Sequence, residues 1–171
     1  ENYWKLWVNK EMFNFHDLPQ RFVSFFKRSL LIIRTQIDNN GAIIAANDSD
    51  IVQLGRDTYS YMWPRDGALV AYALIKSGYM DATKRFFQFC ADVISKDGYL
   101  LHKYNPDRSF ASSWHPWLKD DKKSLPIQED GIALVIWALW HHYDEFRDIE
   151  FVKPLYRSFI MNAAEFMVKF I

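Results

Sequence analysis

Two clusters of polar and aromatic residues have the side-chain types that a sugar site needs. The first is segment 57–67, Asp-Thr-Tyr-Ser-Tyr-Met-Trp-Pro-Arg-Asp-Gly, in which Arg65 and Asp66 follow Tyr61 and Trp63. Adjacent charges can bind sugar hydroxyls, and an aromatic face can cover the C–H side of a pyranose ring. The alternative is structural, because Asp66 is also placed as an acid in the first turn of a helix.

The second cluster lies further along the chain. It contains Trp114 and Trp117, followed by Gln128, Glu129 and Asp130 just ahead of a very apolar run. The polar side chains at 128–130 could point into the same site as Arg65, at the end of the molecule where both long loops emerge. They could equally cap the helix that follows, a role that contributes about 1 kcal/mol.

Other motifs favour structural roles. Cys90 falls on an apolar helical stripe, which predicts a core position. His141 and His142 are adjacent on a helix and cannot share a metal as an i, i+4 pair does. The motif Asp-Ser-Asp at 48–50 is short and common by chance, and Asp-Asp-Lys-Lys at 120–123 is typical of a solvated surface. We therefore predict no metal and no cofactor.

An all-helical framework is expected to position the two clusters. Apolar residues recur at helical spacing, whereas segments 38–63 and 98–130 have no helical period. If successive helices run up and down, both long loops emerge at the same end and can build one site. The expected helices cover 18–37, 64–78 and 81–95, followed by a fourth that contains the apolar run 132–140 and ends before a turn at 143–148, and a fifth from about 154 to 171.

The last two of these helices need more packing than a small bundle supplies. Residues 132–140 are apolar on every side, which predicts burial all round. The stripe of the final helix continues to Ile171 without a glycine or polar cap. We therefore expect self-association through exposed helices.

Composition narrows the classes of partner. The 171 residues are 50% hydrophobic and 25% charged and include seven tryptophans, nine tyrosines and fourteen phenylalanines, so a packed core is expected. Twenty-one basic residues balance twenty-one acidic ones, which argues against nucleic acid. The apolar run 132–140 is too short for a bilayer span, so no membrane partner is expected. A start without a signal peptide, together with a single cysteine, favours the cytoplasm.

The motifs resemble the catalytic domain of family 15 glycoside hydrolases, the glucoamylases, glucodextranases and prokaryotic trehalases. The resemblance rests on Tyr-Met-Trp-Pro-Arg-Asp-Gly-Ala at 61–68 and on Pro-Ile-Gln-Glu-Asp-Gly at 126–131, which leads into the apolar run 133–139. It implies a partial (α/α)6 barrel, about the first five helices of a six-hairpin toroid, with two long site-forming loops. Residues 1–17 would lead into the catalytic domain, and 18–171 would be its N-terminal portion.

The resemblance also implies roles for residues. Arg65 and Asp66 would hold the hydroxyls of the terminal, non-reducing glucose, with Tyr61 and Trp63 beside them. Trp114 corresponds to a tryptophan loop near the scissile bond, although its spacing to Gln128 is longer than in the fungal enzymes. Gln128, Glu129 and Asp130 would complete the substrate-binding set; where the family often has a further acid, this chain has Gly131.

The catalytic acids are expected elsewhere. An inverting glycosidase needs a general acid and a general base about 6.5 to 9.5 Å apart, and the resemblance places both glutamates beyond Ile171. It thus implies an inactive segment of an inverting exo-acting α-glucosidase, with no catalytic residue of its own, whose partner is an α-linked glucose oligosaccharide or disaccharide. The alternative is a non-catalytic helical carbohydrate-binding or scaffold module that uses Trp63, Trp114 and Trp117.

Overall fold

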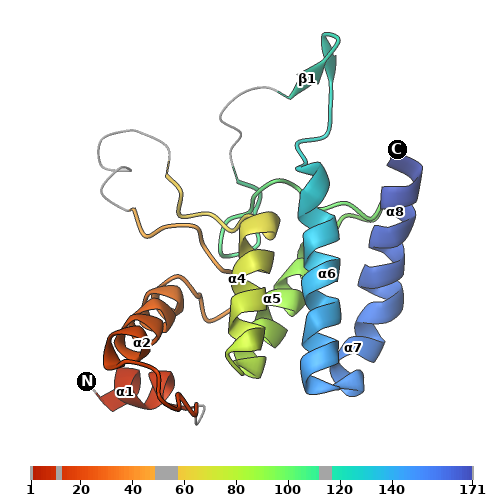
Figure 1. Cartoon of the computed structure of the whole chain (residues 1–171). Coiled ribbons are helices and arrows are strands. Elements are labelled where there is room, and N and C mark those ends of the chain that lie inside the picture. The colour runs from red at the N-terminus through yellow and green to blue at the C-terminus, as the bar shows by residue number, and fades with distance from the viewer. Residues whose placement is uncertain (1, 11–12, 49–57, 112–116, 171) are drawn as a thin grey trace.

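A computed structural model describes residues 2–10, 13–48, 58–111 and 117–170, and over these ranges the protein is mainly helical (Figure 1). A small antiparallel hairpin interrupts the helices. The elements are α1 Asn2–Val8, α2 Gln20–Thr35, α4 Pro64–Lys76, α5 Met80–Val93, β1 Leu118–Lys119, β2 Lys122–Lys123, α6 Glu129–Phe146, α7 Ile149–Leu155, a π-helical turn Tyr156–Met161 and α8 Asn162–Phe170.

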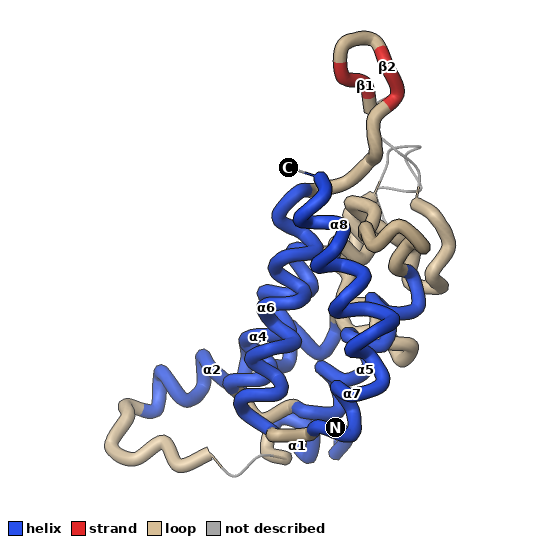
Figure 2. The backbone as a smooth tube through the Cα atoms, turned by 90° about the vertical axis from the view of Figure 1, so that its right-hand side faces the viewer, coloured by secondary structure: helices blue, strands red, loops and turns tan. Residues whose placement is uncertain are grey.

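Helices α4 and α6 lie side by side at the centre and begin at the same end of the molecule (Figure 1). Both pack on α5, while α8 packs on α6 from the other side. The turned view shows the β1–β2 hairpin standing clear of the helices at the end where α6 begins (Figure 2). The described parts of the two long loops thus lie at one end of the helices, as predicted.

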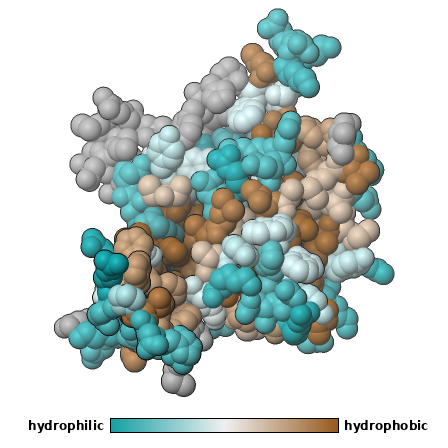
Figure 3. Space-filling view, in the orientation of Figure 1, coloured by the Kyte–Doolittle hydropathy of each residue, from teal (hydrophilic) through white to brown (hydrophobic). Residues whose placement is uncertain are grey.

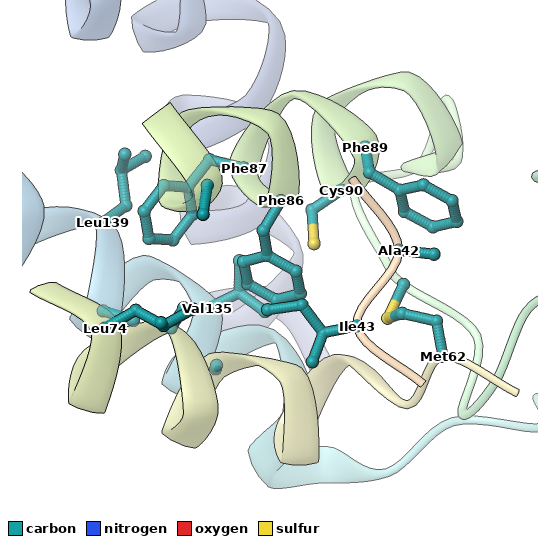
Figure 4. Packing of buried hydrophobic residues seen from close by; sticks show 14 of the residues in the cluster. Ala42, Ile43, Met62, Leu74, Phe86, Phe87, Phe89, Cys90, Val135 and Leu139 are labelled. Carbon is teal, nitrogen blue, oxygen red and sulfur yellow. The ribbon is translucent and has the colours of Figure 1, made fainter. Parts of the chain in front are cut away.

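The core forms where α5 meets α4, α6 and the first long loop. Phe86, Phe87 and Cys90 of α5 are fully buried and face Leu74 of α4 and Val135 of α6 (Figure 4). Ala42, Ile43 and Met62, all from the first loop, close the same cluster. Burying one large apolar side chain stabilises a fold by roughly 1.5 to 3 kcal/mol, so this cluster anchors the loop as well as the helices.

The local sequence explains how α4 begins and ends. Pro64 occupies the first helical position, where its missing N–H costs no hydrogen bond, and Asp66 lies in the first turn. The helix stops at Lys76, and Gly78 follows with φ of 76°, a conformation that suits glycine. The predicted bounds of 64–78 are thus close to those observed.

Helix α6 is only partly covered by the described residues, which agrees with the expectation that it needs more packing than a small bundle supplies. It extends from Glu129 to Phe146. Trp140 is 57% exposed, and Trp137 is also exposed. The physical reason is that α4, α5 and α8 cover only part of its circumference. None of the helices in the described ranges has the length and apolar character that a bilayer crossing demands.

The final helical segment begins earlier than predicted. Its N-cap is Asp148, whose carboxylate accepts a hydrogen bond of 3.2 Å from the Phe151 backbone N–H. Pro154, which sequence reasoning placed at the helix start, lies inside α7. The wider π-helical turn that follows it accommodates the interrupted hydrogen-bond ladder before α8 continues the helix.

Candidate functional site

Backbone pairing joins the two long loops just before α4 begins. The Met62 N–H donates to the Tyr104 carbonyl at 2.9 Å, and the Tyr104 N–H donates to the Met62 carbonyl at 2.9 Å. On the other side of Met62, isolated β-bridges connect Ile44 to Met62 and Ile37 to Ile43. Residues about forty positions apart in the sequence are thereby fixed beside one another.

This pairing builds an aromatic wall around a buried lysine. Tyr61 and Trp63 flank Met62 and meet edge to face, with ring centroids 5.7 Å apart. Lys103, which precedes Tyr104, is only 1% exposed. Its Nζ atom lies 4.0 Å from the centroid of the Tyr61 ring, so the cation faces the aromatic surface.

Sequence reasoning missed Lys103. The residue lies in the second irregular segment, and a pairing across the fold brings it to Tyr61. One local signal was present, because Lys103 is a charge within the otherwise apolar and aromatic stretch Leu-Leu-His-Lys-Tyr at 100–104. Lysine is rarely buried to this degree, which makes such a position a candidate for function.

Arg65 and Asp66 form the charged part of the site at the start of α4. The Arg65 Nε atom lies 3.4 Å from Asp66 Oδ2, and both side chains are partly exposed. An ion pair of this kind adds little stability. The Asp66 Oδ2 atom is shielded from solvent yet accepts no hydrogen bond from the described residues. A shielded carboxylate oxygen without a hydrogen bond is uncommon in folded proteins and marks Asp66 as a candidate functional residue.

The start of α6 lies against the start of α4. A Cβ atom added at Gly131 would be 3.9 Å from the Arg65 backbone nitrogen, so the first turns of the two helices are in contact. Gln128 is the N-cap but makes no capping hydrogen bond with its side chain, and its shielded Oε1 atom accepts none from the described residues. Glu129 and Asp130 are exposed in the first turn.

The helix-capping alternative is therefore wrong for the Gln128 side chain. For Glu129 and Asp130 a position in the first helical turn favours their charge whether or not they bind a ligand. Gln128 and Glu129 also line a cavity of about 430 Å³, which extends to Phe166 and Met167 of α8. This cavity therefore lies at the end of the molecule where α6 begins.

The tryptophans of the second loop are only partly placed. Trp114 lies outside the described residues. The Trp117 ring lies 5.1 Å from the His102 ring, and the His102 N–H donates to the Pro126 carbonyl at 2.7 Å, which ties this end of the loop to Lys103. Trp117 thus lies beside His102, the residue that precedes the buried Lys103.

Cys90 occupies the core as predicted, whereas His142, for which a surface or core-edge position was expected, is fully buried as well. Cys90 is fully buried, and burial raises the pKa of its thiol well above the usual range. His142 is buried with its Nδ1 atom 2.9 Å from the Thr83 hydroxyl, whereas the neighbouring His141 packs against Tyr72. Among the described residues, no three His, Cys, Asp or Glu side chains gather where they could hold a metal ion.

Comparison with known proteins gives consistent results. The family described as glycosyl hydrolases family 15 matches residues 24–169. The uncharacterized glycosyl hydrolase MJ1610 of Methanocaldococcus jannaschii is 29% identical over 169 residues, covering 97% of this chain and 24% of that protein. The chain thus spans about a quarter of the length of this curated relative.

Solved glycosidase structures share the fold. A glycosidase variant in complex with glucose superposes with a TM-score of 0.66 at 22% identity, and a wild-type glycosidase with 0.63 at 21%. In each case the match covers 92% of this chain and 43% of the solved one. The family match extends over most of the chain, from α2 to α8. The chain belongs to glycosyl hydrolase family 15.

Proposed function

We propose that residues 18–171 are the N-terminal portion of the catalytic domain of an inverting, exo-acting α-glucosidase, with residues 1–17 leading into it. In this proposal the complete domain is an (α/α)6 barrel. Helices α2, α4, α5, α6 and the continuous α7–α8 segment supply about its first five helices. The family match and the partial coverage of the solved glycosidases support this assignment.

The proposed role of this chain is to anchor the terminal, non-reducing glucose of an α-glucan or related α-glucoside. The observation that carries the proposal is the Arg65–Asp66 ion pair, which lies where the first turns of α4 and α6 meet. Arg65 would donate hydrogen bonds to sugar oxygens, and the shielded Asp66 Oδ2 would accept one from a hydroxyl. The glucose bound in a related glycosidase supports a sugar as the ligand.

Other residues complete the proposed subsite. The Gln128 Oε1 atom would accept a second hydroxyl, and Glu129 and Asp130 would add acceptors from the first turn of α6. Tyr61 would form the wall beside the sugar ring, and Trp63 would support this wall from behind. Lys103 would hold a fixed positive charge behind this wall. In the same proposal, Trp114 flanks the scissile bond.

Hydrolysis with inversion requires one carboxylic acid to protonate the leaving oxygen and one carboxylate to activate water. We assign neither role to an acid of this chain. Both would belong to the part of the enzyme outside residues 1–171, so the chain alone binds sugar and does not cleave it.

A maltose titration of the purified chain, followed by tryptophan fluorescence, tests the proposal. Maltose should bind, and Arg65→Ala should abolish binding. Arg147→Ala is the matched control, because Arg147 lies at the opposite end of α6 and pairs with Asp144. Unchanged binding in Arg65→Ala would contradict the sugar site. Release of glucose by the chain alone would contradict the assignment of the catalytic acids.

We also propose that the chain self-associates through helix faces that its own described residues leave uncovered. Apolar surface is visible over α2 and along α4 and α6 (Figure 3). Phe25 of α2 is 72% exposed, and Phe22, Trp137 and Trp140 are exposed as well. Apolar side chains grouped in this way favour association with another protein surface.

A further inference from the structure

Asp48 binds three consecutive residues just ahead of the aromatic wall. Its Oδ1 atom accepts a hydrogen bond from the Ser60 hydroxyl at 2.6 Å and another from the Thr58 hydroxyl. Its Oδ2 atom accepts from the Tyr59 backbone N–H at 2.7 Å. The Ser60 hydroxyl and the other two donors hold the pKa of Asp48 down to about 2, so the carboxylate is charged and the bonds are charge-assisted.

Tyr59 is thereby fixed from two directions. Its N–H donates to Asp48, while its carbonyl accepts from the Ala46 N–H at 3.2 Å. The Asp48 N–H also donates to the Ser60 hydroxyl at 3.3 Å. The backbone that carries the Tyr59 ring is thus held on both its donor and its acceptor side.

The ring held in this way is the outer member of a stacked pair. Tyr59 and Trp63 have centroids 5.7 Å apart and an angle of 29° between their planes. Tyr59 is 54% exposed, whereas Trp63 is only 6% exposed. Tyr61 meets Trp63 edge to face. The aromatic surface that a ligand can reach in this stack therefore belongs to Tyr59, and Trp63 supports it from behind.

We propose that Asp48 is a positioning residue for the sugar site, and that it acts by holding Tyr59 over Trp63 as the exposed stacking platform. The proposal rests on the sugar site proposed above. Stacking on a sugar requires one ring orientation, and an exposed tyrosine loses part of its binding free energy if it must first be ordered. The bonds of Asp48 supply that order before the ligand arrives.

A purely structural role for Asp48 fits the contacts less well. Thr58 and Ser60 are half-buried, Tyr59 is exposed, and none of the three belongs to the hydrophobic core cluster. The carboxylate connects two stretches of the same long loop and makes none of these bonds to a helix. Removing it should therefore change the wall of the site much more than the stability of the fold.

A double-mutant cycle tests whether Asp48 acts through Tyr59. Asp48→Ala and Tyr59→Ala should each weaken maltose binding about tenfold, because each removes the ordered stacking platform. The affinity of the double variant for maltose should be no lower than that of the single variant that binds maltose less tightly. Asp107→Ala is the matched control, since Asp107 accepts from the Ser109 N–H and hydroxyl in the same manner without contacting Tyr59. Additive losses, or unchanged binding in Asp48→Ala, would overturn the proposal.

Near-ultraviolet circular dichroism provides a readout that does not require sugar. Asp48→Ala should lose the same Tyr–Trp signal that Tyr59→Ala loses, whereas Asp107→Ala should retain it. If the wild-type chain binds no maltose, the proposed function fails, and this signal still decides whether Asp48 holds the ring. If maltose binds and the signal survives in Asp48→Ala, the positioning role alone is overturned.

Discussion

The Nζ atom of Lys103 lies 4.0 Å from the centre of the Tyr61 ring and 5.7 Å from that of Trp63. A buried cation on an aromatic face contributes about 2 kcal/mol when water is excluded, but its desolvation offsets much of that gain. We propose that Lys103 serves sugar binding through these two rings, in addition to its effect on stability.

Replacing Lys103 by methionine should separate these two effects. Lys103→Met keeps a long apolar side chain but removes the charge and its contacts to the Tyr61 and Trp63 rings, so the free energy of unfolding should fall by up to about 2 kcal/mol. Affinity for maltose should fall about tenfold, the loss of one interaction of roughly 1.4 kcal/mol. Urea unfolding and fluorescence titration measure the two quantities. Lys76→Met, which removes a solvent-exposed lysine paired with Glu145, should leave maltose affinity unchanged; an equal loss there would show that the effect is not local.

The close approach of α4 and α5 depends on the absence of a side chain at Gly67. A Cβ atom there would lie 2.4 Å from Phe86 Cε2, and Phe86 is fully buried against Phe87. Gly67→Ala should lower the free energy of unfolding by about 2 kcal/mol through overpacking. The measurement is urea unfolding.

Gly131→Ala is the natural comparison for Gly67→Ala. The nearest atom to an added Cβ at Gly131 is Gln128 Cβ at 3.8 Å, which is ordinary contact. Alanine is the better helix former, so this variant should be up to about 1 kcal/mol more stable than the wild type. Destabilisation of both variants to the same extent would contradict the packing described for α4 and α5.

Stability should depend on pH through His142. Burial, followed by the nearby Lys84, lowers the pKa of His142 from 6.5 to about 4, while Asp148 acts in the opposite direction. Below pH 6.5 the unfolded chain takes up a proton that the folded chain does not. The free energy of unfolding should therefore fall between about pH 6.5 and 4, by up to about 1.4 kcal/mol per pH unit.

Urea unfolding at several pH values measures this slope. His142→Gln should flatten it, because the titrating group is removed. Thr83→Val should lower stability at every pH and retain the slope, since it removes the hydroxyl beside Nδ1 but leaves the buried imidazole. Asp148 does not affect the slope in this pH range. The hydrogen bond from Lys84 lowers its pKa, so the stability that its charge contributes is lost only at more acidic pH. Equal wild-type stability at pH 6.5 and 4.5 would contradict the prediction.

Self-association should depend on the exposed aromatic residues. Light scattering of the wild-type chain should show species larger than a monomer. Trp140→Glu and Phe25→Glu should reduce this association, because each places a charge in an apolar face. Arg157→Glu changes an exposed residue outside those faces and serves as a charge control. A wild-type chain that remains a stable monomer would contradict the proposal.

The helices of the central array were predictable because their information is local. Apolar spacing gave α2, α4 and α5 with bounds close to those observed, and Pro64 marked the start of α4. The start of α7 was misplaced because the apolar stripe of the final helix was taken to begin at about Pro154. Asp148 is an ordinary N-cap, and giving it more weight would have placed the helix correctly.

The arrangement of the candidate site was predictable only where its residues follow one another along the chain. Arg65, Asp66, Tyr61 and Trp63 share one segment, so their proximity is a matter of spacing. Lys103 reaches Tyr61 through the pairing of Met62 with Tyr104, which no local pattern indicates. The exposure of Tyr59 in place of Trp63 follows from how two rings stack, and composition contains no such information.

The pairing of the loops also decides where the sequence can change length. Before the hairpin in the sequence, an isolated bridge joins Tyr104 to Phe110. After it, the Pro126 carbonyl accepts a hydrogen bond from the His102 N–H. Between these fixed points rises the hairpin β1–β2, whose residues are all exposed. Lengthening or trimming this hairpin would leave Lys103, Tyr61 and the start of α6 in register. A change of length at this position would therefore alter the rim of the proposed glucose anchor without displacing the anchor itself.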